Sequence, residues 1–171
     1  MRQIRIVTLV FLFPLLISLS ACGKSPEQAR KELGQMNIAY TKENFLRFAL
    51  DGDNVVVDLF LKAGMNPNSK KDGRGPLSGF TALHFSAMKG HVSTVRTLLD
   101  GGANKNSENL ERWTPLHKAV YHNQIEVVKL LIAKRADINA QTMDGQTAAN
   151  LAEEFGYTDI VKLLKDAGAN E

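Results

Sequence analysis

The sequence predicts an all-α solenoid in which four helix-turn-helix repeats follow an N-terminal capping helix. Thr81, Thr114 and Thr147 are equally spaced, and two further columns of residues recur with the same period. Within each unit, apolar residues recur at the three- and four-residue spacing of an amphipathic helix. In the last unit, the polar residues Glu153 and Lys165 replace the apolar residues of earlier units. A fixed period with an atypical last unit is typical of a stacked repeat protein.

The composition is that of an ordinary folded domain. Hydrophobic residues make up 44% of the 171 residues and charged residues 23%, which excludes a disordered chain. The formal net charge is only +3. A protein that binds nucleic acid usually has a more basic surface. Nucleic acid is therefore not an expected partner.

The first 21 residues have the features of a secretory signal peptide. Arg2 and Arg5 precede an apolar run that extends from residue 6 to residue 19. This run of fourteen residues is shorter than the stretch of about 20 that a transmembrane helix needs. A charged start followed by a short apolar run predicts a signal peptide over residues 1–21.

Cys22 is the only cysteine, so it has no intramolecular disulfide partner. Residues 19–22, LSAC, resemble the lipobox of bacterial lipoproteins. The resemblance implies that Cys22 carries lipid at the mature N-terminus, that residues 22–24 join this membrane anchor to the fold, and that the protein is in the cell envelope. Gly23 in place of an aspartate favours the periplasmic face of the outer membrane. The alternative is an ordinary or uncleaved signal peptide followed by a free cysteine.

Residues 25–42 are predicted to form the N-terminal capping segment, with a helix over residues 25–39. Ser25 is a suitable N-cap, Pro26 is suited to the first helical position, and Gln28 follows three residues after the cap. Apolar residues then recur at helical spacing. Because only Gly23 and Lys24 separate this helix from Cys22, we expect the repeats to lie close to the membrane.

The repeats are predicted at residues 43–73, 81–113, 114–146 and 147–171. The interval between the first two units is longer than the interval between the later ones. The five additional residues fall in the glycine- and lysine-rich segment 69–80. This composition predicts a lengthened loop between the first two repeats.

The opening residues of two units, TPLH at 114–117 and TALH at 81–84, resemble the ankyrin repeat, whose unit of about 33 residues consists of a turn and two helices. The resemblance implies a neutral motif histidine that hydrogen-bonds to the motif threonine and to the neighbouring repeat. The last unit departs from the pattern, because Asn150 occupies the histidine position. The residues expected to hold the repeats together are Thr81, His84, Thr114, Pro115, His117 and Thr147.

No catalytic or metal site is expected. Trp113 and His117 lie close together in the sequence, but a catalytic histidine needs a nucleophile or a carboxylate partner. The chain contains no G-x-S-x-G motif, and no paired carboxylates or glycine-rich phosphate loop are evident. His84 and His117 stand one full repeat apart, without the spacing of zinc ligands. We therefore expect no enzyme activity, no cofactor and no small-molecule substrate.

The resemblance to ankyrin repeats also implies hairpin-like fingers between the repeats and a concave surface beside them. This surface is lined by the residue before the motif threonine and by two positions near the end of the first helix. Aromatic, methionine and charged side chains occupy these positions, and aromatic and methionine side chains are enriched at protein interfaces. The alternative is that the aromatic residues only cover neighbouring fingers. The expected partner-binding residues are Phe80, Met88, Lys89, Trp113, Tyr121, His122 and Phe155.

These observations predict a non-catalytic module that is anchored to a bacterial membrane and binds another protein. The alternative function is that of an inhibitor or immunity protein that blocks a secreted or periplasmic enzyme, such as a phospholipase. The same scaffold serves both functions, so the sequence does not separate them.

Overall fold

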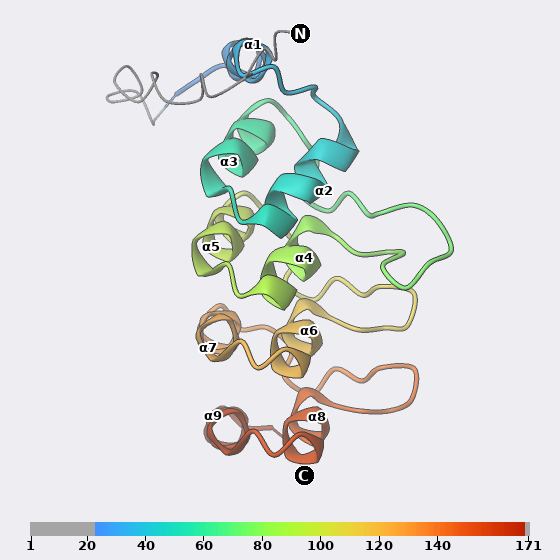
Figure 1. Cartoon of the computed structure of the whole chain (residues 1–171). Coiled ribbons are helices and arrows are strands. Elements are labelled where there is room, and N and C mark those ends of the chain that lie inside the picture. The colour runs from blue at the N-terminus through green and yellow to red at the C-terminus, as the bar shows by residue number, and fades with distance from the viewer. Residues whose placement is uncertain (1–22, 170–171) are drawn as a thin grey trace, which may run out of the picture.

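The structure, a computed structural model, describes residues 23–169, which form helix pairs stacked in one direction (Figure 1). The predicted signal peptide and the predicted lipidation site, Cys22, lie outside the described residues. Apart from an isolated antiparallel bridge between Lys70 and Thr81, the described part of the chain contains no β-structure. Its helices are α1 (Pro26–Gln35), α2 (Lys42–Asp51), α3 (Asn54–Lys62), α4 (Ala82–Lys89), α5 (Val92–Asp100), α6 (Pro115–Tyr121), α7 (Ile125–Ala133), α8 (Ala148–Glu154) and α9 (Thr158–Asp166).

The helices form two layers (Figure 1). Helices α2, α4, α6 and α8 contact one another in an inner layer, and α3, α5, α7 and α9 contact one another in an outer layer. Helix α1 packs against α3 and so extends the outer layer by one helix at the N-terminal end. Among residues 23–169, no helix is long and apolar enough to cross a membrane. The predicted all-α solenoid with an N-terminal capping helix is confirmed.

Helix α1 begins where the sequence predicted. The side chain of Ser25 accepts a hydrogen bond from the backbone N–H of Gln28 at 3.2 Å. Leu33 is fully buried where α1 packs against the first repeat. The helix ends before the predicted residue 39, because Asn37 adopts a left-handed backbone conformation with φ 56°. A residue in this conformation commonly ends a helix.

One hydrophobic core runs through the whole stack. The small residues Ala87 and Ala119 are fully buried and allow adjacent helices to approach closely. Since each repeat buries its apolar stripe mainly against its neighbours, the repeats stabilise one another. The largest fully buried side chains include Phe45, Phe60, Leu83, Leu98, Leu116, Leu131, Leu151, Ile160 and Leu164.

The loops between repeats form hairpin-like fingers that project on the side of the inner helices (Figure 1). The first finger closes where the N–H of Lys71 donates to the carbonyl oxygen of Phe80 at 2.7 Å. The second closes where the N–H of Asn109 donates to the carbonyl oxygen of Trp113 at 3.0 Å. The first finger extends beyond the other two, as expected from the additional residues in segment 69–80 (Figure 1).

Candidate functional site

The motif histidine of the second repeat, His84, joins two repeats. Its Nδ1 accepts a hydrogen bond from the backbone N–H of Thr81 at 3.2 Å and lies 2.9 Å from the hydroxyl oxygen of the same threonine. Its Nε2 lies 2.9 Å from the carbonyl oxygen of Trp113, in the next finger. Because Nδ1 accepts from a backbone N–H, the ring proton is on Nε2, which donates to the carbonyl. A neutral imidazole therefore ties the start of α4 to the following repeat.

His117 makes the same contacts one repeat later. Its Nδ1 accepts from the N–H of Thr114 at 3.2 Å, and its Nε2 lies 3.2 Å from the carbonyl oxygen of Gln146. Pro115 occupies the first position of α6, where its missing N–H removes no helical hydrogen bond. Both histidines are thus engaged at both ring nitrogens.

Asn150 replaces the histidine in the last repeat. Its side-chain oxygen accepts from the backbone N–H of Thr147 at 3.0 Å, so the start of α8 is still capped. The shorter amide side chain lacks the second ring nitrogen that would reach a following finger. Within the described residues no finger follows α9, and this repeat makes no contact equivalent to that of His84 with the Trp113 carbonyl.

Burial controls the protonation of these histidines. It lowers the pKa of His84 to about 4, although the hydrogen bond to the Trp113 carbonyl acts in the opposite direction. Burial likewise lowers the pKa of His117. Within residues 23–169, no group of three or more His, Cys, Asp or Glu side chains is arranged to hold a metal ion. The two histidines therefore act as neutral hydrogen-bonding groups at pH 7.

We expect the free energy of unfolding to fall by about 2 kcal/mol between pH 7 and pH 5 through His84 alone. The ordinary pKa of histidine is 6.5 and that of folded His84 is about 4, so the unfolded chain binds more protons in this interval. The stabilisation is present above pH 6.5 and is lost as the pH falls towards 4. Urea-unfolding midpoints at the two pH values measure it. A His84→Asn variant with the same pH dependence as the wild type would contradict this prediction.

Phe80 does not belong to an exposed surface, so its assignment as a partner-binding residue is wrong. Its side chain is 1% exposed. Its ring packs against the rings of His84 and Phe85, with centroid distances of 5.2 and 5.3 Å. The Nζ of Lys118, from the next repeat, lies 5.0 Å from the Phe80 ring centroid and covers it. Phe80 is therefore a core residue at the base of the first finger.

Solvent-accessible aromatic side chains form a continuous series from the end of the second repeat to the fourth, named here the aromatic ladder: Trp113, Tyr121, Phe155 and Tyr157. The ring of Tyr121 makes edge contacts with those of Trp113 and Phe155, at centroid distances of 5.4 and 5.2 Å. Phe155 stacks on Tyr157 at 5.7 Å. Tyr121 is 44% exposed and Phe155 42%, whereas Trp113 and Tyr157 are half-buried. Because each ring contacts the next, the ladder presents a preformed apolar surface.

Basic groups gather at the Trp113 end of the aromatic ladder. The Nζ of Lys118 lies 3.8 Å from the Trp113 ring centroid, which is a cation–π contact. Burial lowers the pKa of Lys118, and the charge of Glu111 partly offsets this. The exposed His122 also has a lowered pKa, first through burial and then through the charges of Lys118 and Lys89. Lys89 is exposed, so this end of the ladder offers positive charge to a partner.

The structure adds two residues that the sequence analysis missed. Tyr157 extends the aromatic ladder, and Lys118 lies over Trp113. In the repeat alignment, Lys118 shares its column with Phe85 and Leu151, which are both buried. The presence of a lysine at a position that is apolar in the second and fourth repeats could have indicated that Lys118 has a special role. Met88, another of the expected partner-binding residues, is half-buried and packs against the core, as Trp113 and Tyr157 do.

The finger tips carry a second exposed apolar feature. Leu77, Leu110 and Met143 occupy the same position in successive fingers, and their side chains are 36%, 65% and 68% exposed. The backbone N–H of Met143 donates to the carbonyl oxygen of Glu111 at 3.0 Å, which links two neighbouring fingers. The fingers therefore present apolar side chains in a repeating order next to the inner helices.

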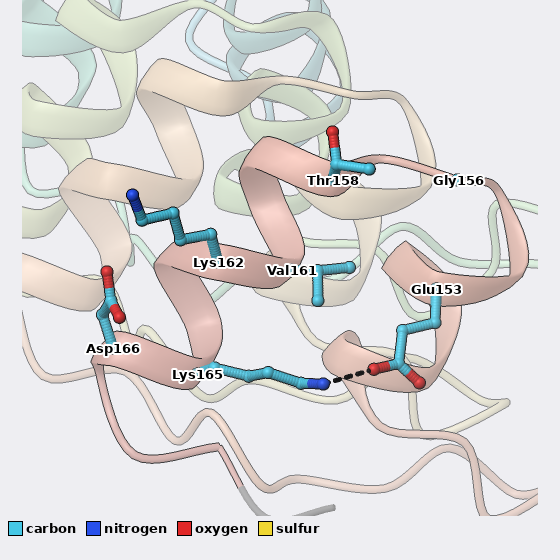
Figure 2. A pocket seen from close by; sticks show the side chains of 7 residues that line it. All are labelled: Glu153, Gly156, Thr158, Val161, Lys162, Lys165 and Asp166. Atoms are coloured by element: carbon cyan, nitrogen blue, oxygen red, sulfur yellow. Dashed lines mark ion pairs between the residues drawn. The ribbon is translucent and has the colours of Figure 1, made fainter.

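A shallow hollow lies on α8 and α9, at the C-terminal end of the stack (Figure 2). Lys165 and Glu153 form an ion pair of 2.9 Å at this hollow (Figure 2). These are the two polar residues that replace apolar residues of the earlier repeats. Val161 lines the hollow with a half-buried apolar side chain. The hollow is thus on the exposed side of α8 and α9, and the residues that line it do not include those of the aromatic ladder.

The fold and its side-chain surface define a helical-repeat protein. The chain belongs to the ankyrin-repeat family, since the family model described as "Ankyrin repeats (3 copies)" matches residues 45–142 and, again, residues 111–171. A comparison with curated proteins finds no match. Ankyrin repeats are modules of protein–protein interaction and are typically non-catalytic.

Proposed function

We propose that this chain is a membrane-anchored ankyrin-repeat lipoprotein whose aromatic ladder binds another protein in the bacterial cell envelope. The observation that carries the proposal is the exposure of Tyr121 and Phe155, 44% and 42%, within a series of rings that already contact one another. A large exposed apolar patch often marks an interaction site. Tryptophan and tyrosine are also enriched among the residues that dominate binding energy.

The preformed state of the aromatic ladder supports a binding role. Rings that are held by their neighbours lose little side-chain entropy when a partner docks. Trp113 is held by Tyr121 on one side and by the Lys118 ammonium group on its face. A surface of this kind gains its affinity from contact area and shape, as protein interfaces do.

The motif histidines support a non-catalytic role. His84 and His117 each use one ring nitrogen within their own repeat and the other towards the next finger. A general base needs a ring nitrogen that can reach the proton of a substrate. Neither histidine offers one without breaking a contact between repeats.

The binding role is tested by crosslinking capture from native membranes. Tagged full-length protein is compared with the Trp113→Ala/Tyr121→Ala variant. A protein recovered with the wild type and lost with the variant is the expected partner. The identity of that protein also separates a scaffold from an inhibitor, because an inhibitor captures a secreted or periplasmic enzyme.

The anchoring role rests on the LSAC segment and on Cys22 as the only cysteine. Helix α1 begins at Pro26, four residues after Cys22. A lipid on Cys22 therefore holds the capping helix, and with it the repeats, near the membrane surface. We place the anchored protein at the periplasmic face of the outer membrane.

Cys22→Ala is expected to abolish lipid labelling and membrane anchoring. Wild-type protein grown with an alkyne analogue of palmitate should be labelled and should stay with the membrane pellet in high salt, because lipidation requires the sulfur. The variant should be unlabelled, either as a soluble protein or as an unprocessed precursor of higher mass. Separation of inner and outer membranes on a density gradient tests the location. An unlabelled wild type, or a labelled variant, would contradict the anchor.

A further inference from the structure

Lys118 places a positive charge on the aromatic ladder that no acidic side chain neutralises by direct contact. Its Nζ lies 3.8 Å from the ring centroid of Trp113 and 5.0 Å from that of Phe80, so it lies between the bases of two consecutive fingers. The residue is half-buried. No ion pair formed within residues 23–169 includes Lys118 or Lys89. Both ammonium groups are thus available to a carboxylate from outside.

The acidic groups near the ladder leave this charge in place. Glu111, on the second finger, interacts with Lys118 only at longer range. Glu154 lies on the fourth repeat, where its carboxylate accepts a hydrogen bond from the side chain of Gln146 at 3.0 Å. The surface therefore carries its positive charge near Trp113 and presents aromatic rings further along, at Tyr121 and Phe155.

We propose that the partner presents an acidic segment, in which an Asp or Glu carboxylate binds Lys118 and Lys89 while an adjacent aliphatic or aromatic side chain packs on Tyr121 and Phe155. This inference rests on the proposed function and specifies the chemistry of the partner. Docking on the ladder removes water from Lys118, and a desolvated ammonium group is costly unless a carboxylate accompanies it. A basic segment would be repelled at the same position.

A library of random peptides displayed on phage provides the probe. It is selected on full-length Cys22→Ala protein, so that a lipid anchor does not interfere, and is then depleted on the same protein carrying Trp113→Ala. The peptides that remain are expected to carry an excess of Asp and Glu over Lys and Arg, next to aliphatic or aromatic residues. Lys118→Gln should weaken their binding about tenfold, whereas Lys118→Arg should retain most of it.

Two controls test whether the positive charge of Lys118 is responsible for peptide binding. Lys129→Gln changes an exposed lysine on α7 that pairs with Glu126, and it should leave peptide binding unchanged. Higher salt should weaken binding to the wild type more than binding to Lys118→Gln, because salt screens the charge contribution.

The outcomes of the selection distinguish a failure of the acidic-partner inference from a failure of the proposed binding surface. A Trp113-dependent peptide pool without an excess of acidic residues would overturn this inference and leave the proposed binding surface in place. A pool that Trp113→Ala retains in full, or the absence of any pool, would overturn both. Lysine-dependent flotation of the Cys22→Ala protein with vesicles of phosphatidylglycerol and phosphatidylethanolamine, without selection of acidic peptides, would assign the surface to lipid and overturn the inference.

Discussion

His84→Ala is expected to lower the free energy of unfolding by about 3 kcal/mol at pH 7. The substitution leaves the N–H of Thr81 and the carbonyl oxygen of Trp113 without their histidine partner. It also removes the ring that packs against Phe80 at a centroid distance of 5.2 Å. A buried polar group without a partner costs about 1–3 kcal/mol, and a cavity adds to this. Urea unfolding followed by circular dichroism measures the change.

Two further variants separate the bond within a repeat from the bond between repeats. His84→Asn retains an acceptor for the Thr81 N–H and should lose mainly the bond to the Trp113 carbonyl, so its cost should be intermediate. Asn150→Ala changes the same motif position in the exposed last repeat and should cost only about 1 kcal/mol, as loss of a helix cap does. If Asn150→Ala destabilised the protein as much as His84→Ala, the contact between repeats would not be the source of the effect.

The sequence alone predicted the repeat architecture because the fold is built by translation of one unit. A constant period determines which positions face the neighbouring repeat. Lys165 and Glu153 interrupt the apolar columns, and in the structure they pair at 2.9 Å on the exposed end of the stack. The start of the first helix could be predicted from a local interaction, because the side chain of Ser25 accepts a hydrogen bond from a backbone N–H in the first turn.

The burial of single side chains could not be predicted in the same way. Phe80 and Trp113 share a column, but Phe80 is 1% exposed and Trp113 is half-buried. The difference arises because Phe80 packs against Phe85, whereas Lys118 occupies the position of Phe85 one repeat later. A lysine packs its aliphatic stem on apolar surface but keeps its ammonium group towards water. It therefore buries the neighbouring ring less completely than a phenylalanine does. The environment of a column thus depends on neighbours whose identity changes from repeat to repeat.

The aromatic ladder escaped full prediction for a related reason. Phe155 and Tyr157 stack at 5.7 Å across the turn between α8 and α9. The equivalents of Tyr157 in earlier repeats are His91 and Gln124, which instead hydrogen-bond to carbonyl oxygens of the preceding repeat. Because His91 and Gln124 make polar contacts at this position, the repeat alignment did not indicate that Tyr157 would make an aromatic contact in the last repeat.

The Trp113→Ala/Tyr121→Ala variant is expected to weaken binding of the captured partner at least about 100-fold. Each anchor residue at the centre of an interface contributes about 2 kcal/mol or more. The two rings contact each other at 5.4 Å, so their effects should not add independently. The two single variants and the double variant, measured by titration of purified partner against purified protein, give the coupling between the rings.

Val55→Ala is the matched control, because Val55 is 52% exposed but lies on α3 in the outer layer. It removes exposed apolar surface at a distance from the aromatic ladder and should leave affinity unchanged. Trp113 is half-buried, so a loss of affinity counts only if circular dichroism and the unfolding midpoint show that the double variant remains folded. A folded double variant with wild-type affinity would exclude the ladder. Binding would then have to involve the finger tips, where Leu110 and Met143 are the most exposed apolar side chains.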